Sequence, residues 1–205
     1  MKLTFHPFDL RLHHTFTIAH DSRDVQPTLV VQLHDGKWTG LGEATSNKYY
    51  GVTIEGMMEA LDNISSELAA YEWGTPEELW DLVRPQLQDY SFAQCALDQA
   101  AHDLYAKKQD KKLYEAWGFQ RNESILTNYT IGIDTIEKMV AKLKEVPWPL
   151  YKIKLGTEDD LAIIKELRKH TNAVFRVDAN CAWDVEKTLT LAPKLKELGV
   201  EFIEQ

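Results

Sequence analysis

The sequence of 205 residues predicts an α+β domain followed by a parallel α/β domain. Up to about residue 122, β-rich segments are followed by segments with the apolar periodicity of helices. Beyond that point, short strands alternate with helices at intervals of about 25 residues, as successive βαβ units do. We therefore place a domain boundary near residue 122, between domains spanning residues 1–122 and 123–205.

The first domain begins with segments typical of an antiparallel sheet. Leu3 to Leu12 alternates loosely between apolar and polar residues, and Thr28 to Leu33 is rich in β-forming residues. The stretch His34 to Lys37 predicts a turn that leads into a strand from Trp38 to Glu43. We expect the pair His13-His14 to decorate an exposed strand end.

Helical periodicity then runs from Val52 to about Gly118. The sequence Thr75-Pro76-Glu77-Glu78 is a capping box with proline at the first helical position, and Ser91 to Lys108 predicts another amphipathic helix. Apolar residues recur at three- and four-residue steps in the first of these helices: Ile54, Met57, Met58, Leu61, Ile64 and Leu68.

The second domain fits two α/β architectures, an open doubly wound sheet or a (β/α)₈ barrel. A dinucleotide-binding sheet would carry a glycine-rich turn after its first strand, whereas Gly132-Ile133-Asp134 has a single glycine, which disfavours that sheet. In both architectures the chemistry belongs at the carboxyl ends of the strands. The expected strands span residues 125–131, 150–155, 173–178 and 200–204, and the expected helices span 135–145, 158–168 and 184–198.

Charge and composition narrow the class of partner. Lysine and arginine total 23 against 32 aspartate and glutamate residues, and the net charge of −9 argues against nucleic acid or an anionic membrane as partner. No apolar run approaches the roughly 20 residues of a membrane span, and residues 1–6 lack a signal-peptide core, so we expect a cytoplasmic protein. Cys95 and Cys181 form no CxxC motif, so any metal is expected to take oxygen ligands.

Charged side chains stand at the carboxyl ends of successive expected strands. Lys152 and Lys154 lie two residues apart and therefore share one face of their strand. The next strand ends at Asp178 and the one after it at Glu204. Taken singly, each has an ordinary structural interpretation: lysines that reach toward water, an aspartate that forms a turn, and a surface carboxylate.

Together these residues indicate a catalytic site. Lys154, Asp178 and Glu204 recur at intervals of 24 and 26 residues, in phase with the βα repeat. Two inward carboxylates on neighbouring strands repel each other unless a cation lies between them, and an all-oxygen site suits Mg²⁺. A lysine beside that cation and beside Lys152 would have its ammonium form disfavoured, so that Lys154 could act as a base near neutral pH.

The same residues resemble the enolase superfamily, in its muconate-lactonizing subgroup, and most of all the dipeptide epimerases of the L-Ala-D/L-Glu epimerase type. The resemblance implies an α+β capping domain followed by the first half of a (β/α) TIM-type barrel, with strands 1–4. It rests on a small α+β domain and on the segments Phe16-Thr17-Ile18-Ala19, Gly40-Leu41-Gly42-Glu43-Ala44, Asn128-Tyr129-Thr130, Lys152-Ile153-Lys154-Leu155-Gly156 and Val177-Asp178-Ala179-Asn180.

The resemblance implies an isomerase that epimerises dipeptides with Mg²⁺, by abstracting the proton α to a carboxylate through an enediolate intermediate. Carried over by position, Lys154 is the catalytic base, and Lys152 is its catalytic companion that contacts the substrate carboxylate. Asp178 and Glu204 are the first two metal ligands. Thr130 matches a substrate-contacting position, although a strand-end threonine could equally cap the turn.

The family also needs a third metal ligand and an opposed lysine on later strands, and neither lies before Gln205. We therefore expect the chain to be C-terminally incomplete, with an incomplete active site. A muconate-type cycloisomerase or an o-succinylbenzoate synthase/N-acylamino acid racemase is an alternative, which a D-x-D segment on a later strand would separate from an epimerase. In another class, the chain is a non-catalytic fragment that acts as a binding or assembly module. The expected partner is a dipeptide, and a homo-oligomer is left open.

Overall fold

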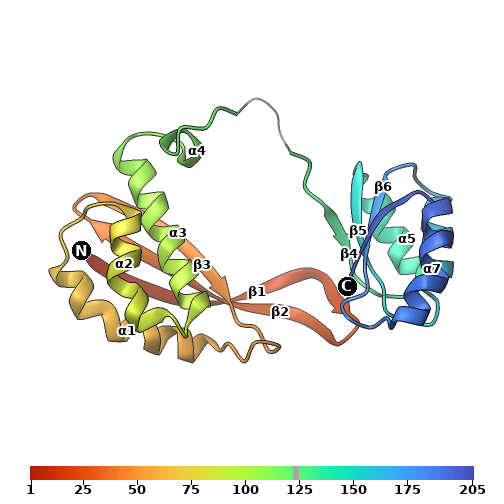
Figure 1. Ribbon diagram of the computed structural model, residues 1–205, viewed down its shortest axis with the longest axis horizontal. Coiled ribbons are helices and arrows are strands. Elements are labelled where there is room, and N and C mark those ends of the chain that lie inside the picture. The colour runs from red at the N-terminus through yellow and green to blue at the C-terminus, as the bar shows by residue number, and fades with distance from the viewer. Residues whose placement is uncertain (122–124) are drawn as a thin grey trace. The chain divides into compact units, whose positions relative to one another are not determined.

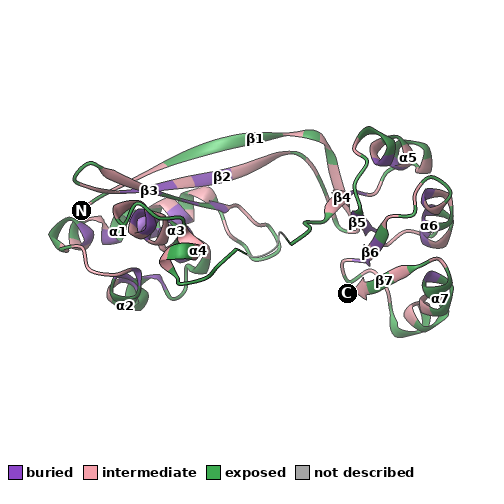
Figure 2. Ribbon diagram, turned by 90° about the horizontal axis from the view of Figure 1, so that it is seen from above, coloured by how far each residue is buried: buried purple, intermediate pink, exposed green. Residues whose placement is uncertain are grey.

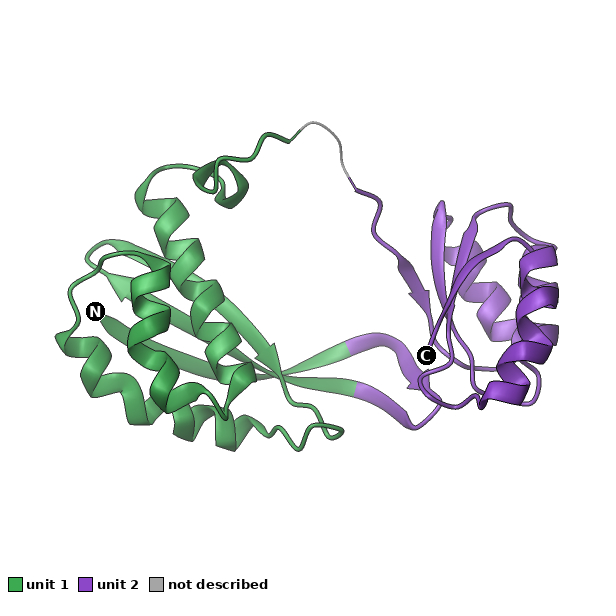
Figure 3. Ribbon diagram, in the orientation of Figure 1, with its two compact units in different colours: residues 1–11, 25–123 green, residues 12–24, 124–205 purple. Residues whose placement is uncertain are grey.

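The computed structural model describes residues 1–121 and 125–205 (Figure 1). They form two compact units, Met1–Arg11 with Val25–Glu123 and Leu12–Asp24 with Ser124–Gln205 (Figure 3). The domain boundary predicted near residue 122 lies outside the described residues and stays a prediction. Among the described helices, none is long and apolar enough to cross a membrane.

One sheet has the strand order β1-β2-β3 and is made of β1 (Lys2–Ile18), β2 (Asp21–Asp35) and β3 (Trp38–Thr45). Most of it belongs to the first unit, but residues 12–24, at the end of β1 and the start of β2, belong to the second unit. β2 and β3 pair antiparallel around a tight turn in which Gly36 has a φ of 58°. The antiparallel sheet is thus confirmed, but β1 and β2 are longer than predicted. Their added segments are largely exposed or half-buried, and strand pairing through the backbone needs no apolar alternation there.

Helices α1 (Ile54–Ala70), α2 (Pro76–Leu87) and α3 (Ser91–Lys108) cover one face of this sheet (Figure 2). The predicted capping box is confirmed, because the Thr75 hydroxyl accepts from the Glu78 backbone N–H and the Glu78 carboxylate accepts from that of Thr75. The short α4 (Leu113–Ala116) lies within the stretch of helical periodicity predicted to reach about Gly118, although it was not predicted as a separate helix. The core joins the inner face of β2 to the helices through Leu29, Val31, Leu33, Leu61, Ile64, Leu97 and Leu104, all at most 1% exposed.

Small residues let α3 lie directly against β3. A Cβ atom added to Gly42 would lie 1.9 Å from the Ala96 carbonyl oxygen, and one added to Gly40 would lie 1.9 Å from that of Ala100. Both contacts are with helix backbone, which cannot move aside as a flexible side chain can. The two glycines therefore set the distance between the sheet and α3.

The second unit is a parallel sheet with the order β4-β5-β6-β7, and the helices that connect its strands lie on one side of it (Figure 2). This confirms the predicted βαβ pattern. The elements are β4 (Tyr129–Ile131), α5 (Ile136–Glu145), β5 (Leu150–Lys154), α6 (Asp160–Arg168), β6 (Val174–Asp178), α7 (Val185–Glu197) and β7 (Val200–Glu204).

The first strand of this sheet is shorter than predicted. We expected it to span residues 125–131, but its pairing with β5 covers Tyr129 to Ile131. Ile125 is 98% exposed and Leu126 is 55% exposed, so these two apolar residues add nothing to the core. Within residues 1–121 and 125–205, no strand pairs with Ile125 or Leu126, and without such pairing an apolar segment does not continue the sheet.

Alternation along β5 sorts its side chains between two faces. Tyr151, Ile153 and Leu155 are at most 1% exposed and belong to the core beneath the helices. Lys152 and Lys154 alternate with them and therefore stand on the opposite face. Core packing thus places both lysines on the face away from the helices.

The loop after β5 is held by the carboxylate of Asp160, which is 1% exposed. Its Oδ1 accepts from the backbone N–H groups of Gly156 (2.9 Å) and Thr157 (2.8 Å) and from the Thr157 hydroxyl (2.9 Å). Its Oδ2 accepts from Trp183 Nε1 at 2.7 Å and lies 3.3 Å from Lys187 Nζ. One buried carboxylate therefore ties the loop that follows β5 to the segment that follows β6.

Substituting Gly42 by alanine should lower the free energy of unfolding by about 1–3 kcal/mol or more, since the new Cβ overlaps the α3 backbone. Leu41→Ala is the matched control, because Leu41 lies on the same strand and is 46% exposed. Urea unfolding followed by circular dichroism measures both. Equal stabilities of Gly42→Ala and Leu41→Ala would contradict the close packing described here.

Asp160→Asn should lower the free energy of unfolding by at least about 2 kcal/mol. The amide has no negative charge for the four groups that donate hydrogen bonds to Asp160, and its own N–H groups would face the N–H donors of Trp183 and Lys187. The exposed neighbour Asp159 provides the control, and Asp159→Asn should change stability by no more than about 0.5 kcal/mol. Thermal unfolding followed by the fluorescence of tryptophan reports the difference. If both variants unfold like the wild type, Asp160 does not hold the loop.

Candidate active site

The register of the parallel strands brings the predicted site residues to one edge of the sheet. Lys154 pairs with Asp178, Asp178 pairs with Glu204, and Thr130 pairs with Lys152. In a parallel sheet, residues paired in register lie side by side on neighbouring strands and face the same way. The sheet thus assembles polar groups from β4, β5, β6 and β7 at the carboxyl ends of the strands.

Asp178 is the centre of this cluster, and its side chain is 2% exposed. Its Oδ2 accepts from Lys154 Nζ at 2.7 Å and lies 3.0 Å from Lys152 Nζ. Its Oδ1 accepts from the backbone N–H of Asn180 at 2.9 Å. A buried carboxylate is stable only when paired and hydrogen-bonded, and both oxygens of Asp178 meet this condition.

Lys152 forms a bridge between the two carboxylates. Its Nζ lies 2.7 Å from Glu204 Oε2 as well as 3.0 Å from Asp178 Oδ2. Its side chain is 22% exposed, and that of Glu204 is 44% exposed, so this end of the cluster faces water. The position between the two carboxylates is therefore one that holds a positive charge.

These contacts set the charge of the cluster. Burial by itself raises the pKa of Asp178, but hydrogen bonds from Lys154, Lys152 and the Asn180 N–H outweigh burial and hold that pKa below its ordinary value. Burial by itself lowers the pKa of Lys152, but hydrogen bonds to Glu204 and Asp178 outweigh it and raise that pKa. Lys152 therefore carries its positive charge between two carboxylates, whereas the expectation that Lys154 serves as a base stays a prediction.

The donor set fits a hard divalent cation. Asp178 and Glu204 offer carboxylate oxygens from adjacent strands, which is the ligand chemistry that Mg²⁺ prefers. The buried Oδ1 of Asn180 has no hydrogen-bond partner in the part of the chain that the structure describes, so it is a further oxygen beside Asp178 that a bound group or water could satisfy. Asp178 and Glu204 would hold the ion, and Lys152 would then have to leave the position between them.

Two features of the site were not predicted. A turn at Asp178 was one interpretation of the sequence, but its conformation was not predicted: Asn180 and Cys181 have φ values of 47° and 61°, in the left-handed region that asparagine tolerates best among larger residues. The Asp160 network behind β5 was also missed. The asparagine in the D-A-N-C sequence could have indicated the left-handed conformation, whereas nothing near Asp160 in the sequence indicates its contact with Trp183.

Both units match known protein families. Residues 3–118 match the family described as "Mandelate racemase / muconate lactonizing enzyme, N-terminal domain". Residues 134–205 match the family described as "Enolase C-terminal domain-like".

Similar proteins of known sequence include the L-Ala-D/L-amino acid epimerases of Flavobacterium johnsoniae and of a Maribacter species, which are 53% and 52% identical over the whole chain. The chain covers 61% and 60% of their lengths. Among solved structures, a dipeptide epimerase from Methylococcus capsulatus, complexed with Mg and the dipeptide L-Arg-D-Lys, has a TM-score of 0.86 and 30% identity. The match covers 100% of this chain and 60% of that one.

The chain thus spans about 60% of the length of the relatives it matches. The first match alone covers more than half of the present sequence, and the second covers the parallel sheet with its strand-end cluster. On these matches, the chain belongs to the mandelate racemase/muconate lactonizing enzyme family of the enolase superfamily.

Proposed function

We propose that this protein is a Mg²⁺-dependent dipeptide epimerase, an isomerase that removes the proton α to a carboxylate and returns a proton to the opposite face. The observation that carries the proposal is the contact of Lys154 Nζ with Asp178 Oδ2 at 2.7 Å, beside the Lys152–Glu204 pair. Such an arrangement offers a base and a cation site side by side. The names of the similar proteins support a dipeptide as the substrate.

In this proposal Lys154 is the base, because it is the less exposed of the two lysines and its Nζ is held in place by Asp178. Lys152 releases Glu204 and meets the carboxylate of the substrate, which its positive charge would bind. Thr130, which pairs with Lys152 across β4 and β5, would contact the substrate from the neighbouring strand. Bound Mg²⁺, held by Asp178 and Glu204, would stabilise the negative charge of the enediolate.

Epimerisation also needs a second acid–base group on the other face of the α-carbon. The third metal ligand and the opposed lysine expected on later strands stay predictions, as does the completion of the parallel sheet into a TIM-type barrel. The cytoplasmic location and a homo-oligomeric state stay predictions as well. The relatives' names favour an epimerase over a cycloisomerase, a racemase or a non-catalytic module.

Replacing Lys154 by arginine should reduce exchange of the substrate α-proton by about 10²–10⁴-fold, the usual contribution of a positioned base. Arginine keeps the positive charge beside Asp178, but its guanidinium stays protonated and cannot accept the proton. Loss of the α-proton signal of L-Ala-L-Glu in D₂O, followed by NMR in the presence of Mg²⁺, measures the rate. The exposed Lys196 provides the control, and Lys196→Arg should exchange at the wild-type rate. Wild-type exchange by Lys154→Arg would rule out this base.

Glu204→Gln should weaken the stabilisation of the protein by Mg²⁺, because one of the two proposed carboxylate ligands is lost. The measurement is the rise in melting temperature as Mg²⁺ is added, with EDTA as the metal-free reference. Glu201→Gln is the matched control: Glu201 lies on the same strand, but its carboxylate pairs with Arg176. An equal Mg²⁺ response in both variants would show that Glu204 is not a ligand.

A further inference from the structure

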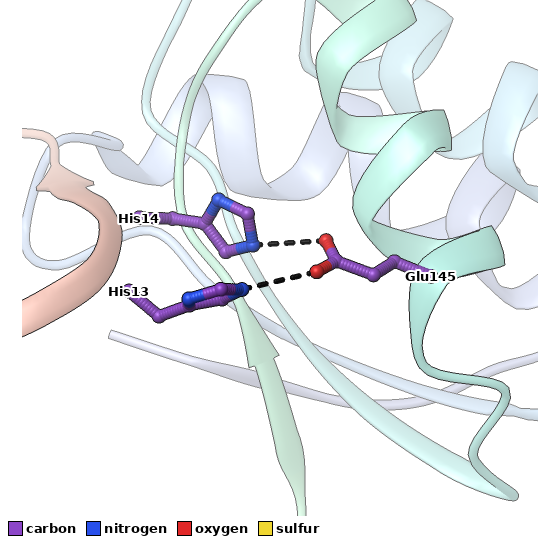
Figure 4. Close-up of side chains that lie close together, drawn as sticks. All are labelled: His13, His14 and Glu145. Carbon is purple, nitrogen blue, oxygen red and sulfur yellow. Dashed lines mark hydrogen bonds and ion pairs between the residues drawn. The ribbon is translucent and has the colours of Figure 1, made fainter.

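Two histidines and one glutamate meet away from the strand-end cluster. His13 and His14 lie on β1, Glu145 is the last residue of α5, and all three belong to the second compact unit (Figure 4). His13 Nε2 lies 3.1 Å from Glu145 Oε1, and His14 Nε2 lies 2.9 Å from Glu145 Oε2. The expected exposure holds for His13, but the pair lies inside β1 and not at its end, and both rings face one carboxylate 131 or more positions away in the sequence.

The convergence of the two rings is unusual for neighbours on a strand. Successive side chains of a strand point to opposite faces, so adjacent histidines seldom approach the same atom group. Here the ring centroids are 4.4 Å apart with the planes at 67°, and both Nε2 atoms point at the carboxylate (Figure 4). One atom from each of the three residues can be chosen so that all lie within 4.8 Å of one another.

The three groups are the ligands of a borderline transition metal. Two imidazole nitrogens and one carboxylate oxygen are a known ligand set of Zn²⁺, with water completing a four-coordinate site. Mg²⁺ prefers oxygen ligands throughout, so this cluster and the Asp178–Glu204 pair differ in the metal that they select. Glu145 supplies the carboxylate oxygen of this ligand set.

Access to the cluster suits an ion that enters from solvent. The side chains of His13, His14 and Glu145 are 80%, 35% and 43% exposed, so water can reach the open coordination position. In the metal-free state each imidazole nitrogen that faces Glu145 carries the proton of its hydrogen bond. A bound ion would replace these two protons and hold all three residues.

We propose that His13, His14 and Glu145 form a binding site for one Zn²⁺ ion. The ion ties the end of β1, together with the following residues up to 24 (the hairpin tip, residues 12–24), to the carboxyl end of α5. The site uses none of the residues assigned to the epimerase reaction. The proposal therefore stands or falls independently of the proposed function.

Isothermal titration of Zn²⁺ into the protein tests the site, with saturating Mg²⁺ present so that the oxygen-ligand site is filled. Cys95→Ser and Cys181→Ser are introduced into every sample, because both cysteines are exposed and thiolates bind Zn²⁺. We expect Zn²⁺ to bind with a stoichiometry of one ion per chain, which we call the tight site. Its affinity should fall by at least about tenfold in His14→Ala and in Glu145→Gln. Both residues are partly exposed, and circular dichroism checks that the variants fold.

The matched control is His170→Ala. His170 Nε2 lies 3.4 Å from Glu166 Oε1, so the end of α6 has a histidine–carboxylate pair but lacks the second imidazole of the proposed site. Its loss should leave the tight site unchanged. The proposal is overturned if no tight site exists, if it survives in both His14→Ala and Glu145→Gln, or if His170→Ala weakens it equally.

Hydrogen–deuterium exchange gives a second measurement that does not depend on heats of binding. Zn²⁺ should slow exchange of backbone amides in residues 12–18 in the wild type and leave them unaffected in Glu145→Gln. Unchanged exchange in the wild type at saturating Zn²⁺ would show that the ion does not hold the hairpin tip.

Discussion

The carboxylate of Asp178, buried between two ammonium groups, is the interaction on which the second unit depends. Burying the charge of a carboxylate that is 2% exposed destabilises the folded state unless a positive charge lies beside it. The Nζ atoms of Lys154 and Lys152 lie 2.7 and 3.0 Å from Asp178 Oδ2 and provide that charge. This match requires β5 and β6 to pair in one register, since a slip by one residue would turn either the acid or the lysines toward the helices. The register of β5 and β6 thus determines both the burial of Asp178 and the pairing of its charge with the two lysines.

The surrounding structure keeps this cluster in place from behind. Asp160 fixes the loop that begins two residues after Lys154, and the left-handed turn at Asn180 directs a backbone N–H onto Asp178. Both devices use buried or backbone groups, which lose little freedom when the site binds a ligand. Glu204 is different, because it is half-exposed and held by Lys152 alone among the contacts described. The cluster thus combines a rigid half, Lys154 with Asp178, and an open half, Lys152 with Glu204.

Much of the second unit could be predicted because its signals are local. Alternation of Ile153 and Leu155 with Lys152 and Lys154 is a property of a few consecutive residues, and so are the caps that begin the helices. Contacts between distant segments could not be predicted in this way. The meeting of His13 and His14 with Glu145 depends on the tertiary fold. The apolar pair Ile125-Leu126 indicated a strand, but the pairing of β4 with β5 begins only at Tyr129. The four strands end within one residue of the positions predicted from the βα repeat, at Ile131, Lys154, Asp178 and Glu204.

The central claim is that Lys152 holds the place of a metal ion between Asp178 and Glu204. A crystal structure of the protein grown with Mg²⁺ and a dipeptide tests this most directly. We expect an ion coordinated by both carboxylates, Lys152 Nζ moved from Glu204 to the dipeptide carboxylate, and Lys154 still beside Asp178. A structure in which the dipeptide is bound but Lys152 still bridges Asp178 and Glu204, with no ion between them, would contradict the account.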